Sequence, residues 1–361
     1  MKEDSFRLLL HGIDTIQCAY YLSAKGEKSG LDFDILSRKR EEIRQAKNSI
    51  SMPVEIGCFE FLLQPYGTPS GYPIVLKNRD FKIEMGEFNW PNFYVTFTSE
   101  ALWKETAFGL HEKFLRWAES IGYIQPKNEK LSRVDFTFDY YLPEIDFTED
   151  HFVSRSTKDS QHRENKKTQT FQFGKGDVVL RVYDKISEII QKSEKVWFFG
   201  LWGESENVWR IEWQVRKEVL KRFGIITFKD LEERYGDILR YLATEHDTLR
   251  IPNGDSNPSR WPLHSLWEDL IKKILNLKHI GIVRDYAEEE IIKERLMRLG
   301  ISVYGYLKRM AALNCMHPKR DLMSFKEALK KMDQLICMVH EPLTWNEDIK
   351  RKVKEIQLGE W

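Results

Sequence analysis

The stretch at 133–139 reads RVDFTFD, in which polar side chains alternate with large apolar ones. The same alternation recurs at 178–184, which reads VVLRVYD, and at 209–216, which reads WRIEWQVR. Side chains along a β-strand point to opposite faces with a period of two, so each stretch predicts a strand with one buried and one polar face. We expect the three strands to pair in one sheet, where their polar faces would coincide.

The shared polar face would carry arginines, carboxylates and one tyrosine hydroxyl. These residues are Arg133, Asp135, Asp139, Arg181, Tyr183, Arg210, Glu212 and Arg216. A single amphipathic strand is usually an ordinary strand whose polar face meets water. A solvated face normally mixes Lys, Thr, Ser and Glu, whereas arginine suits phosphate and short carboxylates suit hard divalent cations. The three stretches together therefore predict a site for phosphate chemistry.

Composition bounds the class of protein. The chain has 361 residues, enough for one large or two modest domains, and its 13% aromatic content favours a well-packed globular protein. The formal net charge is zero, so no global field draws the molecule to nucleic acid, and DNA binding would depend on local patches.

Cysteine usage and hydropathy indicate a cytoplasmic protein. The four cysteines are widely spaced and form no C-x-x-C pair, which argues against a zinc site or a disulfide framework. A reduced cytoplasmic location fits best. No uninterrupted apolar stretch reaches the length of a membrane span, so we expect neither export nor a membrane contact.

The order of the patterns predicts an α+β protein. Strand-like runs and a few helices fill the chain up to about residue 225, and helical patterns follow. We expect a mostly antiparallel sheet with flanking helices as a catalytic domain at 1–225, and an all-helical domain at 226–361 for DNA recognition or oligomerisation. Within the latter, 289–314 holds two helical patterns around an LGIS turn, typical of two packed helices and, less often, of a helix-turn-helix DNA reader.

Residues 150–170 are polar and basic, which predicts a mobile loop. This loop is either a solvated excursion or a clamp on a DNA backbone, in which Lys166 and Lys167 would contact phosphates. The GKG at 174–176 predicts the turn of a hairpin, and no P-loop signature is present, so nucleotide hydrolysis loses its best indicator.

The chemistry of the polar face centres on Tyr183. A tyrosine phenol is mostly protonated at neutral pH, and we expect Arg181 and Lys185 to favour the phenolate. A divalent cation held by carboxylates would polarise a scissile phosphate. The candidate ligands are Asp135, Glu212, Asp139 and Glu188. The neighbouring Asp184 is an alternative ligand or simply a helix cap.

The ordered motifs resemble the Rep_trans family of rolling-circle replication initiators, whose relatives include relaxases. The family's R-x-D-x-x-x-D strand corresponds to 133–139, its Y-[DN]-K-x-x-E motif to 183–188, and its R-x-E strand with a basic tail to 210–216. The resemblance covers roughly 90–225 well and the N-terminal strands loosely. The histidine motif of the other large class of rolling-circle nucleases is absent, because no H-x-H occurs.

The resemblance implies a metal-assisted DNA nickase and strand transferase. Tyr183 would attack one strand at an origin, forming a 5′-phosphotyrosine link and freeing a 3′-OH primer. Arg181, Lys185 and Arg210 would assist the chemistry, Arg133 and Arg216 would bind DNA, and the cofactor would be Mg²⁺ or Mn²⁺. Implied partners are a single-stranded or cruciform origin, a second copy in a homodimer, and a host helicase and polymerase.

Two other readings of the same residues stay open. The chain could be a non-catalytic, sequence-specific DNA-binding protein that keeps the fold. It could also be a metal-dependent nuclease in which water attacks and Tyr183 only positions the phosphate.

Overall fold

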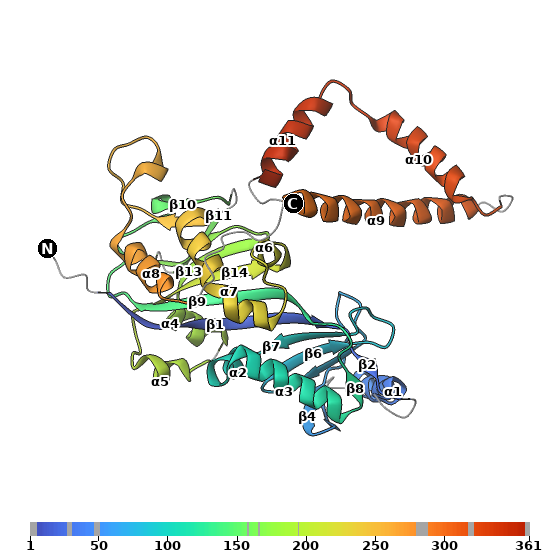
Figure 1. Cartoon of the computed structure of the whole chain (residues 1–361), viewed down its shortest axis with the longest axis horizontal. Helices are drawn as coiled ribbons and strands as arrows, with labels where there is room; N and C mark the ends of the chain where they lie inside the picture. Colours follow the sequence, from blue (N-terminus) through green and yellow to red (C-terminus); the bar gives the residue numbers. More distant parts are fainter. Residues whose placement is uncertain are drawn as a thin grey trace. The chain divides into compact units, whose positions relative to one another are not determined.

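The computed structural model describes residues 6–26, 31–46, 51–156, 159–164, 167–193, 195–278, 288–316 and 321–357 (Figure 1). The chain divides into two compact units, Met1–Asp285 and Tyr286–Trp361. No helix in these ranges combines the length and apolar character needed to cross a membrane.

The first unit is built on one large antiparallel sheet, as the sequence predicts for an α+β protein. Within the described ranges it has eleven strands in the order β11-β12-β13-β14-β9-β1-β7-β6-β5-β4-β3. The strands are β1 (Arg7–Tyr20), β3 (Met52–Ile56), β4 (Phe59–Leu63), β5 (Ile74–Lys77), β6 (Phe81–Met85), β7 (Phe93–Phe97), β9 (Lys130–Tyr141), β11 (Asp159–Glu164), β12 (Lys167–Phe173), β13 (Val178–Asp184) and β14 (Val208–Arg216). Two small sheets pair β2 (Ser23–Ala24) with β8 (Tyr123–Ile124) and β10 (Phe152–Ser154) with β15 (Asp247–Leu249).

The two halves of the large sheet follow the same order. β1 continues into β7, β6 and β5 on one side, and β9 continues into β14, β13 and β12 on the other. Because β1 and β9 are antiparallel neighbours at the centre, this order relates the halves by an approximate two-fold axis through the sheet. The sequence itself shows no repeat.

The helices of the first unit lie between and after these strands. They are α1 (Phe33–Gln45), α2 (Ser99–Lys104), α3 (Ala107–Ser120), α4 (Lys185–Glu188), α5 (Phe198–Trp202), α6 (Lys217–Arg222), α7 (Phe228–Tyr241) and α8 (Ser265–Leu275). Short 3₁₀ turns lie at Glu149–His151 and Pro258–Arg260, and π-helical turns at Ile189–Ser193 and Leu242–His246.

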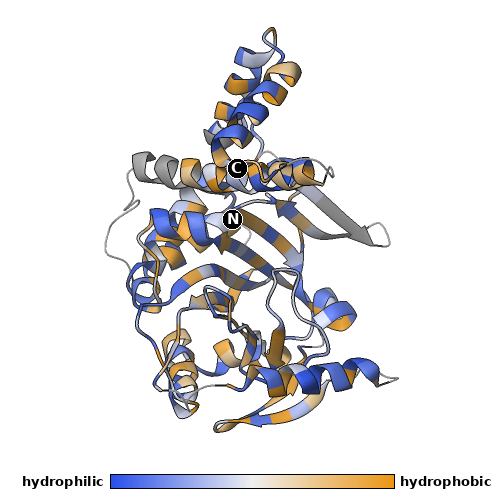
Figure 2. Cartoon of the chain, turned by 90° about the vertical axis from the view of Figure 1, so that its right-hand side faces the viewer, coloured by the Kyte–Doolittle hydropathy of each residue, from blue (hydrophilic) through white to orange (hydrophobic). Residues whose placement is uncertain are grey.

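One face of the sheet carries the hydrophobic core. Alternate residues of β9 and β14, among them Phe136 and Trp213, are buried against apolar side chains of α6, α7 and α8. Trp267 of α8 packs edge-on to Trp213, with ring centroids 5.7 Å apart, and its indole donates to the carbonyl of Ala243 at 2.8 Å. Figure 2 shows the resulting alternation of hydrophobic and hydrophilic bands along the strands. The core fixes which side chains remain on the opposite face.

The core also moves the predicted domain boundary. Division at 225 is wrong because α7 and α8, which follow it, bury Leu231, Ile238 and Trp267 in the same cluster as the sheet. A chain cut at 225 would expose this apolar surface, and the structural boundary lies at 285.

The second unit contains α9 (Glu288–Cys315), α10 (Phe325–Val339) and α11 (Trp345–Gln357). Ser324 caps α10 in a capping box with Glu327. The turn predicted at LGIS is wrong, because α9 runs unbroken through Gly300. A single glycine costs a helix only about 1 kcal/mol relative to alanine, which a long helix tolerates. This segment is therefore not a helix-turn-helix.

The polar stretch at 150–170 is mostly strand rather than the mobile loop that its composition predicts. β11 pairs with β12, and β12 pairs in turn with β13. The ladder supplies the backbone hydrogen bonds that the polar side chains do not predict. The turn at Gly174, which has a φ of +90°, confirms the hairpin between β12 and β13.

Candidate active site on the polar face of the sheet

The three predicted strands pair as neighbours, and their polar faces coincide as expected. In the β13–β14 pair Arg181 lies opposite Glu212 and Tyr183 opposite Arg210, and in the β14–β9 pair Arg210 lies opposite Asp139. Most of this face is buried rather than solvated, so the interpretation as ordinary amphipathic strands fails for it.

The closed end of the face is an ion network around Arg210. Its guanidinium, which is 0% exposed, donates to both oxygens of Asp139 at 2.6 and 2.8 Å and to Oδ1 of Asp14 at 2.8 Å. Trp202 of α5 also donates to Asp139, at 2.9 Å. Asp139 and Arg210 are both 0% exposed and form an ion pair, which favours a structural role for Asp139 over its predicted role as a metal ligand and places Arg210 inside the fold.

Asp14 is the residue that the sequence analysis missed. It lies at a bulge in β1, between the pairs Ile13–Phe136 and Thr15–Asp135, and accepts hydrogen bonds from Arg210, Ser99 and Trp103. Burial alone would raise the pKa of Asp14, but Arg210, Lys195 and Lys185 outweigh it and hold the pKa well below its usual range. An isolated aspartate in an apolar strand carries no motif that could have singled it out.

Aromatic rings cover this closed end. Phe198 of α5 lies under the Arg210 guanidinium, 4.6 Å from the ring centroid, and packs edge-on against Trp103 of α2. Trp103 in turn lies so close to Gly12 of β1 that a Cβ there would come within 2.8 Å of its ring. Gly12 thus admits the indole that shields the network from water.

Tyr183 lies at the border between the closed and open parts of the face. Its side chain is largely buried, the residue being 8% exposed, and its hydroxyl donates to Oε2 of Glu212 at 2.9 Å. Arg181 donates to Oε1 of the same carboxylate at 3.1 Å and to Gln172 at 3.1 Å. Tyr183, Glu212 and Arg181 form the constellation in which a nucleophile and a proton acceptor touch.

The predicted stabilisation of the phenolate is wrong for this arrangement. Burial, followed by the charge of Glu212, raises the pKa of Tyr183 well above its ordinary value, although Arg210 opposes the shift. Lys185 gives no help at the hydroxyl, because it is buried over the Tyr183 ring and forms an ion pair with Glu188. Burial and the nearby Arg210 lower the pKa of Lys185, with Asp14 and Glu188 opposing. Tyr183 therefore needs a base to become a nucleophile.

Asp184 and Glu188 have structural roles. Asp184 is the N-cap of α4 and accepts from the backbone N–H of Ser187 at 3.0 Å, which confirms the capping interpretation. Glu188 binds Lys185 and the hydroxyl of Ser193. Neither carboxylate is directed to the Tyr183 hydroxyl by these contacts.

Asp135 and Glu212 are the carboxylates that could hold a cation. They lie on the same face of the neighbouring strands β14 and β9. Glu212 lies opposite Thr137, and Asp135 is two residues before Thr137 on β9. Burial raises the pKa of Asp135 to about 6, because the lowering effect of its hydrogen bond from Arg133 is opposed by the charge of Glu212. Within the ranges that the structure describes, no three His, Cys, Asp or Glu residues gather as a ready metal site.

The predicted DNA contacts lie at the open end or outside the described side chains. Arg133 pairs with Asp135, its Nε lying 2.8 Å from Oδ1, and Arg216 lies opposite Arg133 in the β14–β9 pair and is exposed. The side chains of Arg133 and Arg181 are 26% and 28% exposed, so both border solvent beside the constellation. Lys166 lies outside the described residues, and Lys167 begins β12 without a described side chain.

Asp135 should make folding stability depend on pH. A carboxyl whose pKa is about 6 when folded, against an ordinary 3.8, binds more protons in the folded state between these values, so stability falls as pH rises through that window. We expect Asp135→Asn to unfold like the parent near pH 4 and to be more stable near pH 7, by on the order of 2 kcal/mol. Urea unfolding at both pH values measures this. A difference that is the same at both values would contradict the shifted pKa.

The chain resembles a solved structure in fold but matches no protein-family model. No protein-family model matches the chain, and no curated protein matches it, so membership of the Rep_trans family stays a prediction. Among solved structures, the chain is similar to the rolling circle replication initiator protein from Geobacillus stearothermophilus, with 17% sequence identity and a TM-score of 0.45. The match covers 76% of this chain and 98% of that one. At this score the likeness does not establish a shared function, so the function proposed for the chain has to rest on the site.

Proposed function

We propose that the chain is a DNA nickase and strand transferase that initiates rolling-circle replication or acts as a relaxase. The observation that carries the proposal is the hydrogen bond from the Tyr183 hydroxyl to Glu212, beside Arg181, on a sheet face that opens to solvent at Arg133. A nucleophile within hydrogen-bond reach of a base, with cationic donors for an oxyanion alongside, is what phosphoryl transfer to a side chain requires.

The chain's own residues account for the steps of attack. Glu212 takes the proton of Tyr183, and the phenolic oxygen forms a bond to the scissile phosphorus while the bond from phosphorus to O3′ breaks. The O3′ oxygen leaves as a 3′-OH with a proton from water, the hydroxide that remains takes the proton held by Glu212, and the 5′ phosphate stays on Tyr183. Arg181 and Arg133, whose side chains border solvent, bind the non-bridging phosphate oxygens. Reversal with a new 3′-OH joins the strand.

The donor set fits a divalent cation. Asp135 and Glu212 are hard oxygen ligands that repel each other, and Mg²⁺ commonly takes one or two carboxylates together with substrate phosphates. Asp135 and Glu212 would hold Mg²⁺ or Mn²⁺. When bound, the cation would neutralise negative charge on the phosphate. The cation would also relieve the repulsion between the two carboxylates.

The partners follow from the reaction. The substrate is DNA, as a single strand or the exposed loop of a cruciform, because Tyr183 is largely buried and a flexible single strand reaches it more readily than a rigid duplex does. A 3′-OH primer implies a polymerase and a helicase. We assign recognition or homodimer assembly to the helical second unit, whose α10 exposes Leu335, Ile336, Met338 and Val339.

A denaturing gel tests the function. Wild-type protein is incubated with labelled single-stranded DNA that carries the origin of its own replicon, with and without Mn²⁺. We expect a covalent protein–DNA adduct that depends on the cation. Free cleaved product without adduct would indicate a nuclease that uses water, and a mobility shift on a native gel without cleavage would indicate a DNA-binding protein. Either result overturns the proposal.

A further inference from the structure

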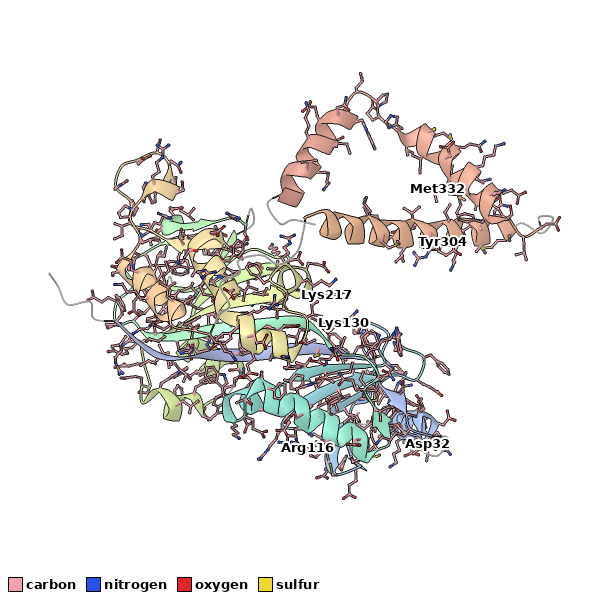
Figure 3. The ribbon with its side chains drawn as sticks, in the orientation of Figure 1. Asp32, Arg116, Lys130, Lys217, Tyr304 and Met332 are labelled. Carbon is pink, nitrogen blue, oxygen red and sulfur yellow. The ribbon has the colours of Figure 1, made fainter. Side chains whose placement is uncertain are left out.

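A cluster of aromatic and basic residues lies away from the constellation, where β1 ends and β9 begins. Trp90 is 63% exposed and packs edge-on against Tyr21, with ring centroids 5.0 Å apart. Lys127 lies over the Trp90 ring and Lys130 over the Tyr21 ring, each ammonium 5.7 Å from the centroid. Figure 3 labels Lys130 at the start of β9. We call these four residues the aromatic–basic cluster.

Polar contacts connect this cluster to the active site. On β7, Tyr94 alternates with the buried Phe93 and Val95, so it lies on the face away from the core. Its hydroxyl donates to Gln17 of β1 at 3.1 Å, and Gln17 lies opposite Arg133 of β9. Arg133 is the residue that binds Asp135 at the constellation.

Tyr72 completes the connection to the cluster. Its ring lies 6.3 Å from that of Tyr94, and its hydroxyl donates to the carbonyl of Pro91 at 3.0 Å. Pro91 directly follows Trp90. These residues therefore lie in succession between Arg133 and Trp90 on one face of the first unit.

The chemistry of these residues favours a single-stranded nucleic acid. Rings exposed beside ammonium groups offer stacking surfaces for bases and charges for phosphates, the combination found in proteins that bind single strands without reading sequence. Tyr94 and Tyr183 lie on strands four steps apart in the sheet, about 19 Å at the usual strand spacing. That span suits several nucleotides of an extended strand. Glu84, which lies opposite Tyr94, is buried in an ion pair with Lys82 and adds little repulsion.

We propose that the aromatic–basic cluster is a stacking and phosphate site for the single strand that flanks the nicked phosphate. The inference deepens the proposed function, on which it rests for the strand's other end at Tyr183. The strand would cross β9 at Arg133 and stack a base on Trp90 or Tyr21, while Lys127 and Lys130 contact its phosphates. The aromatic–basic cluster would hold the strand in place between nicking and joining.

Binding to oligothymidylate, measured by fluorescence anisotropy on the full chain in EDTA, tests the site without cleavage. Trp90→Ala should weaken binding of a strand of about 16 nucleotides by about tenfold, the effect of losing one stacked base. Trp90→Phe should restore most of the affinity. Phe108→Ala, which removes a ring 40% exposed on α3, is the matched control and should have no effect.

The lysines give an independent readout. Removing two phosphate contacts with the double variant Lys127→Gln and Lys130→Gln should reduce the slope of log affinity against log salt by about 1.4, whereas Trp90→Ala should leave the slope unchanged. Both lysines are exposed, so this variant should fold even if Trp90→Ala does not.

The outcomes separate the site from the proposed function. Unchanged affinity and salt slope in all variants would overturn the site, even where wild-type protein forms the covalent adduct. An equal loss of affinity for single-stranded and duplex DNA would overturn it as well, because it would indicate a general basic surface. Loss confined to single strands supports the site, and it would do so even if no adduct formed and the nickase proposal failed.

Discussion

Tyr183→Phe should abolish the covalent adduct with origin DNA while leaving DNA affinity within a few-fold of the parent. The variant lacks the oxygen that forms the bond to phosphorus, so adduct formation should fall by orders of magnitude rather than by a graded amount. DNA affinity should persist because contacts to the phosphate backbone of the DNA supply most of it. The Tyr183 hydroxyl donates its hydrogen bond to Glu212, so its loss removes little of that affinity. Denaturing gels measure the adduct, and anisotropy measures the affinity.

Tyr140→Phe is the matched control for this variant. Tyr140 of β9 also donates a hydrogen bond to a carboxylate, that of Asp269 at 2.9 Å, but it is buried on the core face of the sheet. It should keep full adduct formation. Tyr183→Phe should itself lose about 1 kcal/mol of stability, because one hydrogen bond to Glu212 is removed and the bond from Arg181 remains. Full nicking by Tyr183→Phe would sink the assignment of the nucleophile.

The core of the site was predictable because a strand has a strict period. Once 133–139, 178–184 and 209–216 are strands of one sheet, alternation alone puts Asp135, Glu212 and Tyr183 on the same face, and the pairing bears this out. No knowledge of distant contacts is needed for that step. The antiparallel α+β architecture followed from the same patterns.

Charge balance was not predictable in the same way. The neighbours of Tyr183 along the chain are cationic and suggest a lowered pKa, whereas its hydroxyl is buried and its hydrogen-bond partner across the sheet is Glu212. Sequence proximity gave the wrong sign because pKa depends on spatial neighbours and burial. Asp14 could not be predicted for the same reason, since its partner Arg210 is 196 positions away in the sequence.

Local composition also failed where tertiary contacts decide the structure. The polar stretch before Phe171 forms β11 and β12 because β12 pairs with the edge of β13, and β11 pairs in turn with β12. The helices after 225 resemble a separate helical domain in sequence, since an amphipathic helix buries its apolar stripe equally well against a sheet or against other helices. Trp267 shows which surface it meets only through its contact with Trp213.

Arg210→Ala should be the most destabilising single change in the polar face, by about 3–5 kcal/mol. The guanidinium is the shared partner of Asp14 and Asp139, so its loss leaves two buried carboxylates without their main cation. Urea unfolding measures the change. Arg216→Ala, six residues further along the same face and exposed, should change stability by no more than about 0.5 kcal/mol.

The same pair of variants separates a structural from a catalytic role for Arg210. If Arg210 acts through the fold, Arg210→Ala should lose nicking in proportion to its loss of folded protein, and the fraction that remains folded should keep its adduct-forming activity. Arg216→Ala, by contrast, should weaken DNA binding without changing stability, because an exposed arginine at the open end can contact a phosphate. A folded Arg210→Ala protein of normal stability that fails to form the adduct would reverse the assignment. It would mean that the guanidinium reaches the phosphate after α5 moves aside, and that the closed end of the face opens during the reaction.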